Sequence, residues 1–137
     1  MHAHAAYKQT QNLSMTRIDV ILALYRKALA NLERARQALT EGRPQDARAL
    51  LVDTQTMVIA LASGLPAHKD AAAFDFLRLY EFVSHQLARG EVENVDAAAK
   101  VLRTLFEGFE AVREQAVALE LQGAIPPLDG HHLSLTA

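Results

Sequence analysis

Apolar residues recur at alternating steps of three and four along four stretches of the chain. This spacing places one apolar stripe along a helix, whereas a strand alternates at every second residue. The stripe of the third stretch is Ala72, Phe76, Leu79, Val83 and Leu87. The stripe of the fourth is Val95, Ala98, Leu102, Leu105, Phe109, Val112, Ala116 and Leu119. The pattern predicts four helices, over about 17–41, 44–63, 70–89 and 92–122.

Glycine and proline residues separate these stretches and act as helix stop signals. The breaks fall at Gly42 with Pro44, Gly64 with Pro66, Gly90, and Gly123 with Pro126 and Pro127. Helices of similar length joined by short turns pack as an antiparallel bundle. We therefore expect an all-α fold, an antiparallel up-down four-helix bundle over residues 17–122. Residues 1–16 and 123–137 lack an apolar stripe and are predicted to form a mobile N-terminal arm and a flexible C-terminal tail.

Two of the predicted helix starts carry capping signals. Thr16 precedes Asp19 by three residues, the spacing of a capping box, in which each side chain satisfies a backbone N–H. Pro44 lies where the first turn of a helix tolerates proline. Within the stripes, Leu51, Leu102 and Phe109 are the side chains that we expect in the core.

The composition restricts the class of protein. The chain has 137 residues, of which 50% are hydrophobic and 22% charged, as is typical of one folded domain. Cysteine is absent, which excludes disulfides, thiolate metal sites and cysteine nucleophiles. A net charge of -2 indicates no nucleic-acid partner. Because no apolar run is long enough for a signal peptide or a membrane span, we expect a cytoplasmic protein without membrane insertion.

The sequence carries no recognisable catalytic or metal-binding motif. A di-iron bundle needs Glu-x-x-His elements on two helices, and the chain contains none. Glu81 and His85 share one helix face, which favours an ordinary surface pair. Nucleotide fingerprints and phosphate loops are also missing. We expect no catalytic residue, no metal and no cofactor, and the alternative of a metal-binding bundle enzyme is open to metal analysis of the purified protein.

Several apolar residues lie outside the predicted core stripes. Val52 and Ile59 are seven residues apart on the second helix, and Phe82 flanks the stripe of the third. Leu22 and Leu29 widen the stripe of the first helix to one side. Such residues on adjacent helices can form a groove for another amphipathic helix. Alternatively, a wide apolar face packs deeper than a helical wheel suggests.

Short motifs at characteristic spacing run through most of the chain. Ala6-Tyr7 lies ten residues before the first predicted helix, which contains the run from Val20 to Tyr25. The third contains the run from Leu79 to Val83. Matching positions on the second and fourth helices are Leu50, Leu51, Gln55, Val58 and Leu61, and Leu102, Leu105 and Phe109. Together, over about residues 6–115, these motifs resemble the FliS family of flagellin-specific export chaperones, although Met15-Thr16-Arg17 replaces the family's Ala-Ser-Pro and Phe109 its tryptophan.

The resemblance implies a function. Members of the family are cytoplasmic chaperones that bind the C-terminal helical segment of flagellin, prevent its premature polymerisation and deliver it to the flagellar type III secretion apparatus. Components of the flagellar export gate are further candidate partners. The resemblance also implies that the N-terminal arm folds over the bundle near the flagellin-binding surface. The predicted partner-binding residues are therefore Tyr7, Gln11 and Leu13 of the arm together with Leu22, Leu29, Val52, Ile59 and Phe82.

A second interpretation is a helical adaptor, or a chaperone for a different secreted substrate. The same bundle and the same apolar surface would serve either role, because both need only a preformed face for an amphipathic segment. A pull-down with the flagellin C-terminal segment separates the two interpretations.

Overall fold

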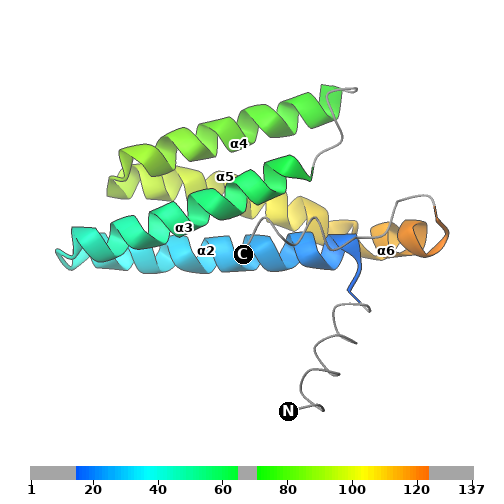
Figure 1. Ribbon diagram of the computed structural model, residues 1–137, viewed down its shortest axis with the longest axis horizontal. Helices are drawn as coiled ribbons and strands as arrows, with labels where there is room; N and C mark the ends of the chain where they lie inside the picture. Colours follow the sequence, from blue (N-terminus) through cyan, green and yellow to red (C-terminus); the bar gives the residue numbers. More distant parts are fainter. Residues whose placement is uncertain (1–14, 65–70, 124–137) are drawn as a thin grey trace, which may run out of the picture.

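The computed structural model describes residues 15–64 and 71–123, and these residues form helices without any strand. The helices are α2 (Arg17–Thr40), α3 (Pro44–Ser63), α4 (Ala71–Arg89), α5 (Val92–Ala111) and α6 (Arg113–Leu121), as shown in Figure 1. The prediction of an all-α bundle is confirmed. Most of the predicted N-terminal arm and C-terminal tail lies outside the described residues, so both remain predictions.

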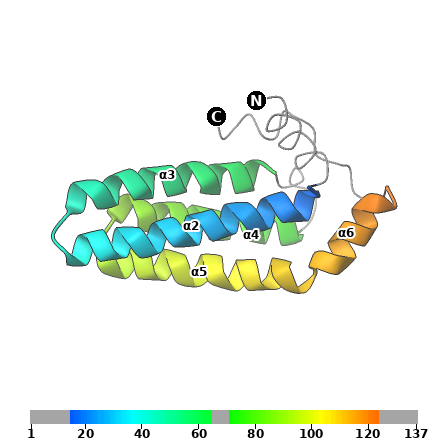
Figure 2. The ribbon, with the colours of Figure 1, turned by 90° about the horizontal axis from the view of Figure 1, so that it is seen from below.

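Four of the helices form a closed ring. α2 packs against α3 and α5, and α4 packs against the same two helices from the other side. The two perpendicular views show the four helices nearly side by side along one long axis (Figures 1 and 2). Consecutive helices run in opposite directions because two short turns, at Gly42 and Gly90, reverse the chain. Both glycines have a positive φ, of 74° and 71°, which residues with a side chain rarely adopt.

The helix starts follow the capping signals in the sequence, with one difference. The Thr16 hydroxyl accepts a hydrogen bond from the Asp19 backbone N–H at 3.4 Å. The Asp19 carboxylate, however, accepts from the Thr16 hydroxyl itself, at 2.9 Å, rather than from a backbone amide. Pro44 occupies the first turn of α3, where its missing N–H leaves no intrahelical bond unmade.

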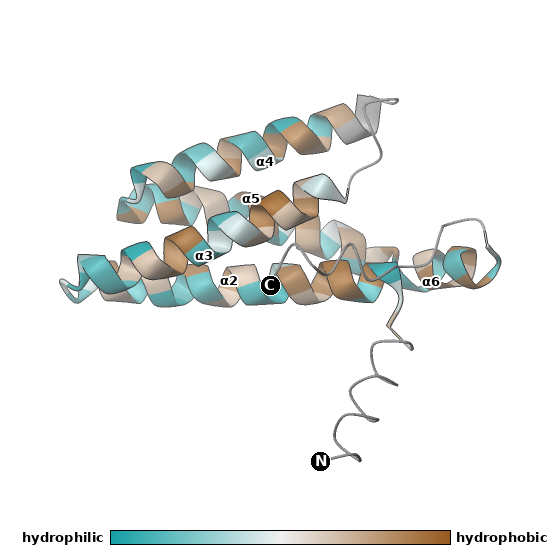
Figure 3. Cartoon of the chain, in the orientation of Figure 1, coloured by the Kyte–Doolittle hydropathy of each residue, from teal (hydrophilic) through white to brown (hydrophobic). Residues whose placement is uncertain are grey.

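The core lies between the four long helices. Its largest fully buried side chains include Tyr25 and Leu32 of α2, Val58 of α3, Val83 of α4 and Leu102 of α5. Figure 3 shows apolar and polar residues alternating along each of these helices, as amphipathic segments require. Among the expected core residues, Leu51 and Leu102 are buried, with 6% and 0% of their surface exposed. Phe109 is half-buried and packs against the cluster from its edge.

The stripe predicted for the third helix is wrong at one position. Leu79 is 37% exposed, whereas its neighbour Tyr80 is 3% exposed and takes the core position. The buried series of α4 is therefore Tyr80, Val83 and Leu87, which keeps the steps of three and four. Leu79 and Tyr80 are both apolar enough for a core position. Tyr80 is favoured because its hydroxyl forms a hydrogen bond with Tyr25 inside the bundle.

The helix predicted over 92–122 is broken in two. α5 ends at Ala111, Val112 leaves the helical conformation, and α6 turns away at an angle that is visible in Figure 2. Val112 and Leu119, both predicted on the core stripe, are 42% and 43% exposed. The prediction fails at Val112 because the helix is interrupted there, and at Leu119 because α6 lies against the start of α2 by a different face.

Polar contacts hold α6 on α2. The Arg113 guanidinium donates two hydrogen bonds to the Asp19 carboxylate, at 2.7 and 3.2 Å. The Glu120 carboxylate accepts a hydrogen bond from the backbone N–H of Arg17 at 3.0 Å. Glu120 thus satisfies one of the free amides at the N-terminus of α2, where a negative charge is favourable.

Candidate functional site

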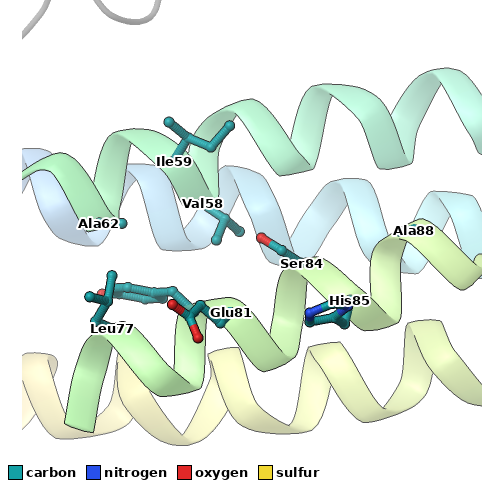
Figure 4. Close-up of a pocket in the computed structure, with 9 residues that line it drawn as sticks. Val58, Ile59, Ala62, Leu77, Glu81, Ser84, His85 and Ala88 are labelled. Carbon is teal, nitrogen blue, oxygen red and sulfur yellow. The ribbon is translucent and has the colours of Figure 1, made fainter. Parts of the chain in front are cut away.

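An apolar groove of about 360 Å³ opens between α3 and α4 (Figure 4). Val58 reaches from α3 toward α4, while Ser84 and Leu77 rise from α4 on the opposite side. The residues that line the groove are Val58, Ile59, Ala62, Leu77, Tyr80, Glu81, Ser84, His85 and Ala88. Most of these side chains are apolar, so the groove offers a surface that favours an apolar ligand face over water.

Helical spacing explains how these residues come together. On α3, Ile59 and Ala62 are three residues apart and lie on one face. On α4, the steps from Leu77 to Glu81 and from Ser84 to Ala88 are each four residues. The space between these two faces is incompletely filled because alanine and serine occupy positions where larger side chains would fill it. We call such a line of contact between two neighbouring helices a seam, and the seam between α3 and α4 is open.

Tyr80, which lines the groove, also belongs to a buried pair of tyrosines. The Tyr80 hydroxyl lies 2.7 Å from that of Tyr25, and this hydrogen bond links α4 to α2 through the interior. Tyr25 is 0% and Tyr80 3% exposed. Burial raises the pKa of both phenols above its ordinary value, because the interior disfavours the charged phenolate. The pair therefore satisfies two polar groups that would otherwise destabilise the core.

The rim of the groove carries the polar groups. Glu81 and His85 line it from α4, four residues apart, and both are exposed. The Gln55 side-chain amide donates to the Ser84 backbone carbonyl at 3.2 Å and so fastens α3 to α4. In the described part of the chain, no three histidine, aspartate or glutamate side chains gather as a metal site. The arrangement is suited to binding an apolar surface, with a few polar groups at the edge to orient it.

The opposite seam, between α2 and α5, is closed. Phe106 and Phe109 of α5 lie against Tyr25, with ring centroids 6.3 and 5.6 Å away. The Arg26 guanidinium lies over the Phe106 ring at 5.4 Å from its centroid. Further along the seam, Arg36 of α2 donates to Asp96 of α5 at 2.8 Å. Bulky rings and crossing side chains fill this seam.

The structure places the predicted partner-binding residues in different surroundings. Ile59 is 61% exposed and lines the groove. Val52 and Phe82 are also exposed, but they do not line it. Leu29 is half-buried against the core. Tyr7, Gln11 and Leu13 lie outside the described residues, and their predicted role is untested.

Among the predicted partner-binding residues within 15–64 and 71–123, Leu22 has the least accessible surface, since only 1% is exposed. In this conformation it offers no face to a partner. Leu22 is instead part of a wide apolar face that packs deeper than a helical wheel suggests, which was the alternative to a groove. Its assignment as a contact residue stays a prediction that would require α2 to become uncovered.

Sequence reasoning missed most of the groove. Ala62, Leu77 and Ala88 were not predicted as functional, because single alanines and leucines in a helix carry no distinctive signal. The usable signal was the run of small residues on facing helices. Small side chains at facing positions indicate a seam that packing leaves open, but this reading requires knowing which helices are neighbours.

Comparisons with known proteins complete the description. None of the helices in the described residues is long and apolar enough to span a membrane. A search of curated proteins finds no match to the chain. The model of a protein family described as flagellar protein FliS matches residues 1–116, and this family is one of flagellar export chaperones rather than enzymes. Since the match spans most of the sequence and the fold is the expected helical bundle, the chain belongs to the FliS family.

Proposed function

We propose that this protein is a cytoplasmic chaperone that binds the C-terminal helical segment of flagellin, prevents its premature polymerisation and delivers it to the flagellar type III secretion apparatus. Family membership supports the role of export chaperone. The open apolar groove between α3 and α4 supports a binding site at this position on the molecule, and we propose that flagellin binds there. Components of the export gate are further proposed partners.

The groove has the chemistry that such a task needs. A segment that becomes helical only in an assembly exposes apolar side chains until then, and these promote aggregation. A preformed apolar groove covers one face of the segment without any covalent chemistry. Ile59 is the most exposed of the large apolar residues at the groove, so it gains the most by being covered.

The polar groups at the rim of the groove set the orientation of the bound helix. Glu81 and His85 stand at the edge of an apolar floor, and both remain in contact with water. Rim groups of this kind contribute little affinity and instead select the orientation of a bound helix. Binding must be reversible, because the partner is released for export. We expect a dissociation constant on the order of nM to μM.

Calorimetry with a flagellin C-terminal peptide tests the proposal. We expect Ile59→Asp to weaken binding by about ten-fold or more, because a charge replaces apolar surface that the peptide buries. Leu121→Asp is the matched control, since Leu121 is 79% exposed on α6, away from the groove. The free energy of unfolding of both variants should lie within about 0.5 kcal/mol of that of the parent protein, as is usual for substitutions at exposed positions.

The outcomes distinguish whether flagellin is the substrate from whether the groove is its binding site. Binding that is lost in Ile59→Asp and kept in Leu121→Asp supports the groove as the flagellin site. Equal affinities in both variants would place flagellin elsewhere on the bundle, and Val52→Asp and Phe82→Asp would then test the two other exposed candidates. No binding by the parent protein would contradict flagellin as the substrate and favour a chaperone for another secreted protein.

A further inference from the structure

The break between α5 and α6 conflicts with the pattern of the sequence. The apolar stripe of α5 continues through the break without a change of step, from Phe109 to Val112, Ala116 and Leu119. This spacing is typical of a single straight helix. Nothing at the break enforces a bend, since Val112 is neither proline nor glycine and the nearest glycine, Gly108, is helical. The chain therefore encodes a continuous helix that the observed conformation interrupts.

Only one residue differs from a straight helix in backbone conformation. Val112 has φ -106° and ψ 10°, while the residues on both sides are helical. A change of a few tens of degrees at this residue would join the two helices. The N-terminus of α6 also lacks a cap among the described side chains. Joining the helices would give its first amides carbonyl partners in the last turn of α5.

The bent conformation is held mainly by charged groups. None of the nine residues of α6, all of which the structure describes, is buried. The face of α6 toward α2 carries Arg113 and Glu120 with half-buried Ala116 and Val117 between them. Leu119 and Leu121 lie on other faces and are exposed. α6 thus makes two polar contacts and a short apolar contact with the bundle but leaves Leu119 and Leu121 exposed, whereas an ordinary docked helix buries its larger apolar residues.

We propose that α5 and α6 form a two-state element. In the bent state, Asp19–Arg113 and Arg17–Glu120 clamp α6 to the start of α2. In the straight state, residues 92–121 form one helix that extends past the end of the bundle. Release removes the charge partner of Asp19 and one cap of the α2 N-terminus together. The element therefore couples the shape of the C-terminal helix to the stability of the first turn of α2.

Distance measurement between two spin labels tests the proposal in the full-length chain. The protein contains no cysteine, so Ala30→Cys on α2 with Ala118→Cys on α6 labels two exposed positions and no others. In the bent state α6 lies against the start of α2, which keeps Ala118 near that helix. In the straight state Ala118 moves away from α2 and past its start, so the straight state gives the longer distance.

Two substitutions should shift the populations in the same direction. Arg113→Met removes the ion pair with Asp19 but keeps an unbranched side chain, and we expect the ratio of straight to bent protein to rise about three-fold. Val112→Ala favours the helical conformation at the break and should raise the same ratio. Arg103→Met is the matched control, because Arg103 is an exposed arginine of α5 with no ion pair among the described residues.

Each outcome decides the proposal. A narrow peak at a longer distance that grows in Arg113→Met and Val112→Ala, and not in Arg103→Met, supports it. A single short distance in all four proteins would overturn it, since the bend would then be fixed. A broad distribution with a loss of helical circular dichroism would also overturn it, because α6 would then unfold on release instead of joining α5.

Discussion

The seams α2–α5 and α3–α4 are built from the same kind of helix, yet one is closed and the other is open. α5 places Phe106 and Phe109 against α2, and their rings fill the space between the helices. At the other seam, Ala62, Ser84 and Ala88 leave a groove of about 360 Å³. The size of a few side chains at facing positions therefore decides which seam is available to a partner. Apolar residues alone do not distinguish a core from a binding surface.

The largest effect is expected at Leu102, in the interior that both seams share. Leu102→Ala removes a side chain that is 0% exposed and leaves a cavity, which should lower the free energy of unfolding by about 2–5 kcal/mol. Urea denaturation measures the change. The matched control is Ile59→Ala at the open seam, which should cost less than about 0.5 kcal/mol because Ile59 already contacts water. Equal costs at the two positions would contradict the distinction between interior and groove.

The buried tyrosine pair should make the bundle sensitive to alkali. Burial raises the pKa of Tyr25, and Tyr80 raises it further, while a phenol in the unfolded chain ionises near about pH 10. Above that pH the unfolded state binds fewer protons than the folded state, so stability is complete below it and falls as the pH rises. The loss should approach about 1.4 kcal/mol per pH unit for each buried tyrosine.

Denaturation at several pH values, from neutral to alkaline, checks this expectation. The control is the double variant Tyr25→Phe with Tyr80→Phe, which removes both hydroxyls and leaves no unpaired partner. Its stability should decline less steeply with pH than that of the parent protein. The same slope in both proteins would show that other groups cause the alkaline loss.

The smallest effect is expected at the rim of the closed seam. Arg36→Ala removes the ion pair with Asp96, whose two side chains are 51% and 49% exposed. We expect a loss of about 0.2–1 kcal/mol that shrinks as salt is added, because water and ions screen exposed charges. Thermal melts at low and high salt measure it. A larger loss that does not depend on salt would mean that packing of the Arg36 stem, rather than its ion pair with Asp96, stabilises this seam.

Local patterns were sufficient to predict the architecture. Steps of three and four, interrupted at Gly42 and Gly90, identified the helices α2 to α4 and the start of α5 because amphipathic periodicity and turn residues are local properties. Leu51 and Leu102 were correctly placed inside. The same stripes predicted the bundle, since four helices with one apolar face each have few other ways to bury those faces.

Non-local contacts explain the errors. Tyr80 takes the core position instead of Leu79 because its hydroxyl meets that of Tyr25, a residue 55 positions away. The break at Val112 is accompanied by contacts to Asp19 and Arg17, which lie near the other end of the described sequence. No window of neighbouring residues contains either pairing. Of the predicted partner-binding residues that the structure describes, only Ile59 lines the groove, because a groove depends on which helix faces become neighbours.

The hydrogen bond between Arg17 and Glu120 joins residues 103 positions apart and so closes nearly the whole described chain into one loop. Closing a long loop is not prohibitive in itself, since each doubling of length adds only about 0.6 kcal/mol of entropy cost. The bond can form only after the bundle has brought both ends together. Docking of α6 is therefore expected as a late event in folding, preceded by the α2–α3 hairpin. Amide exchange in α6 should report the last step of assembly and the first step of opening.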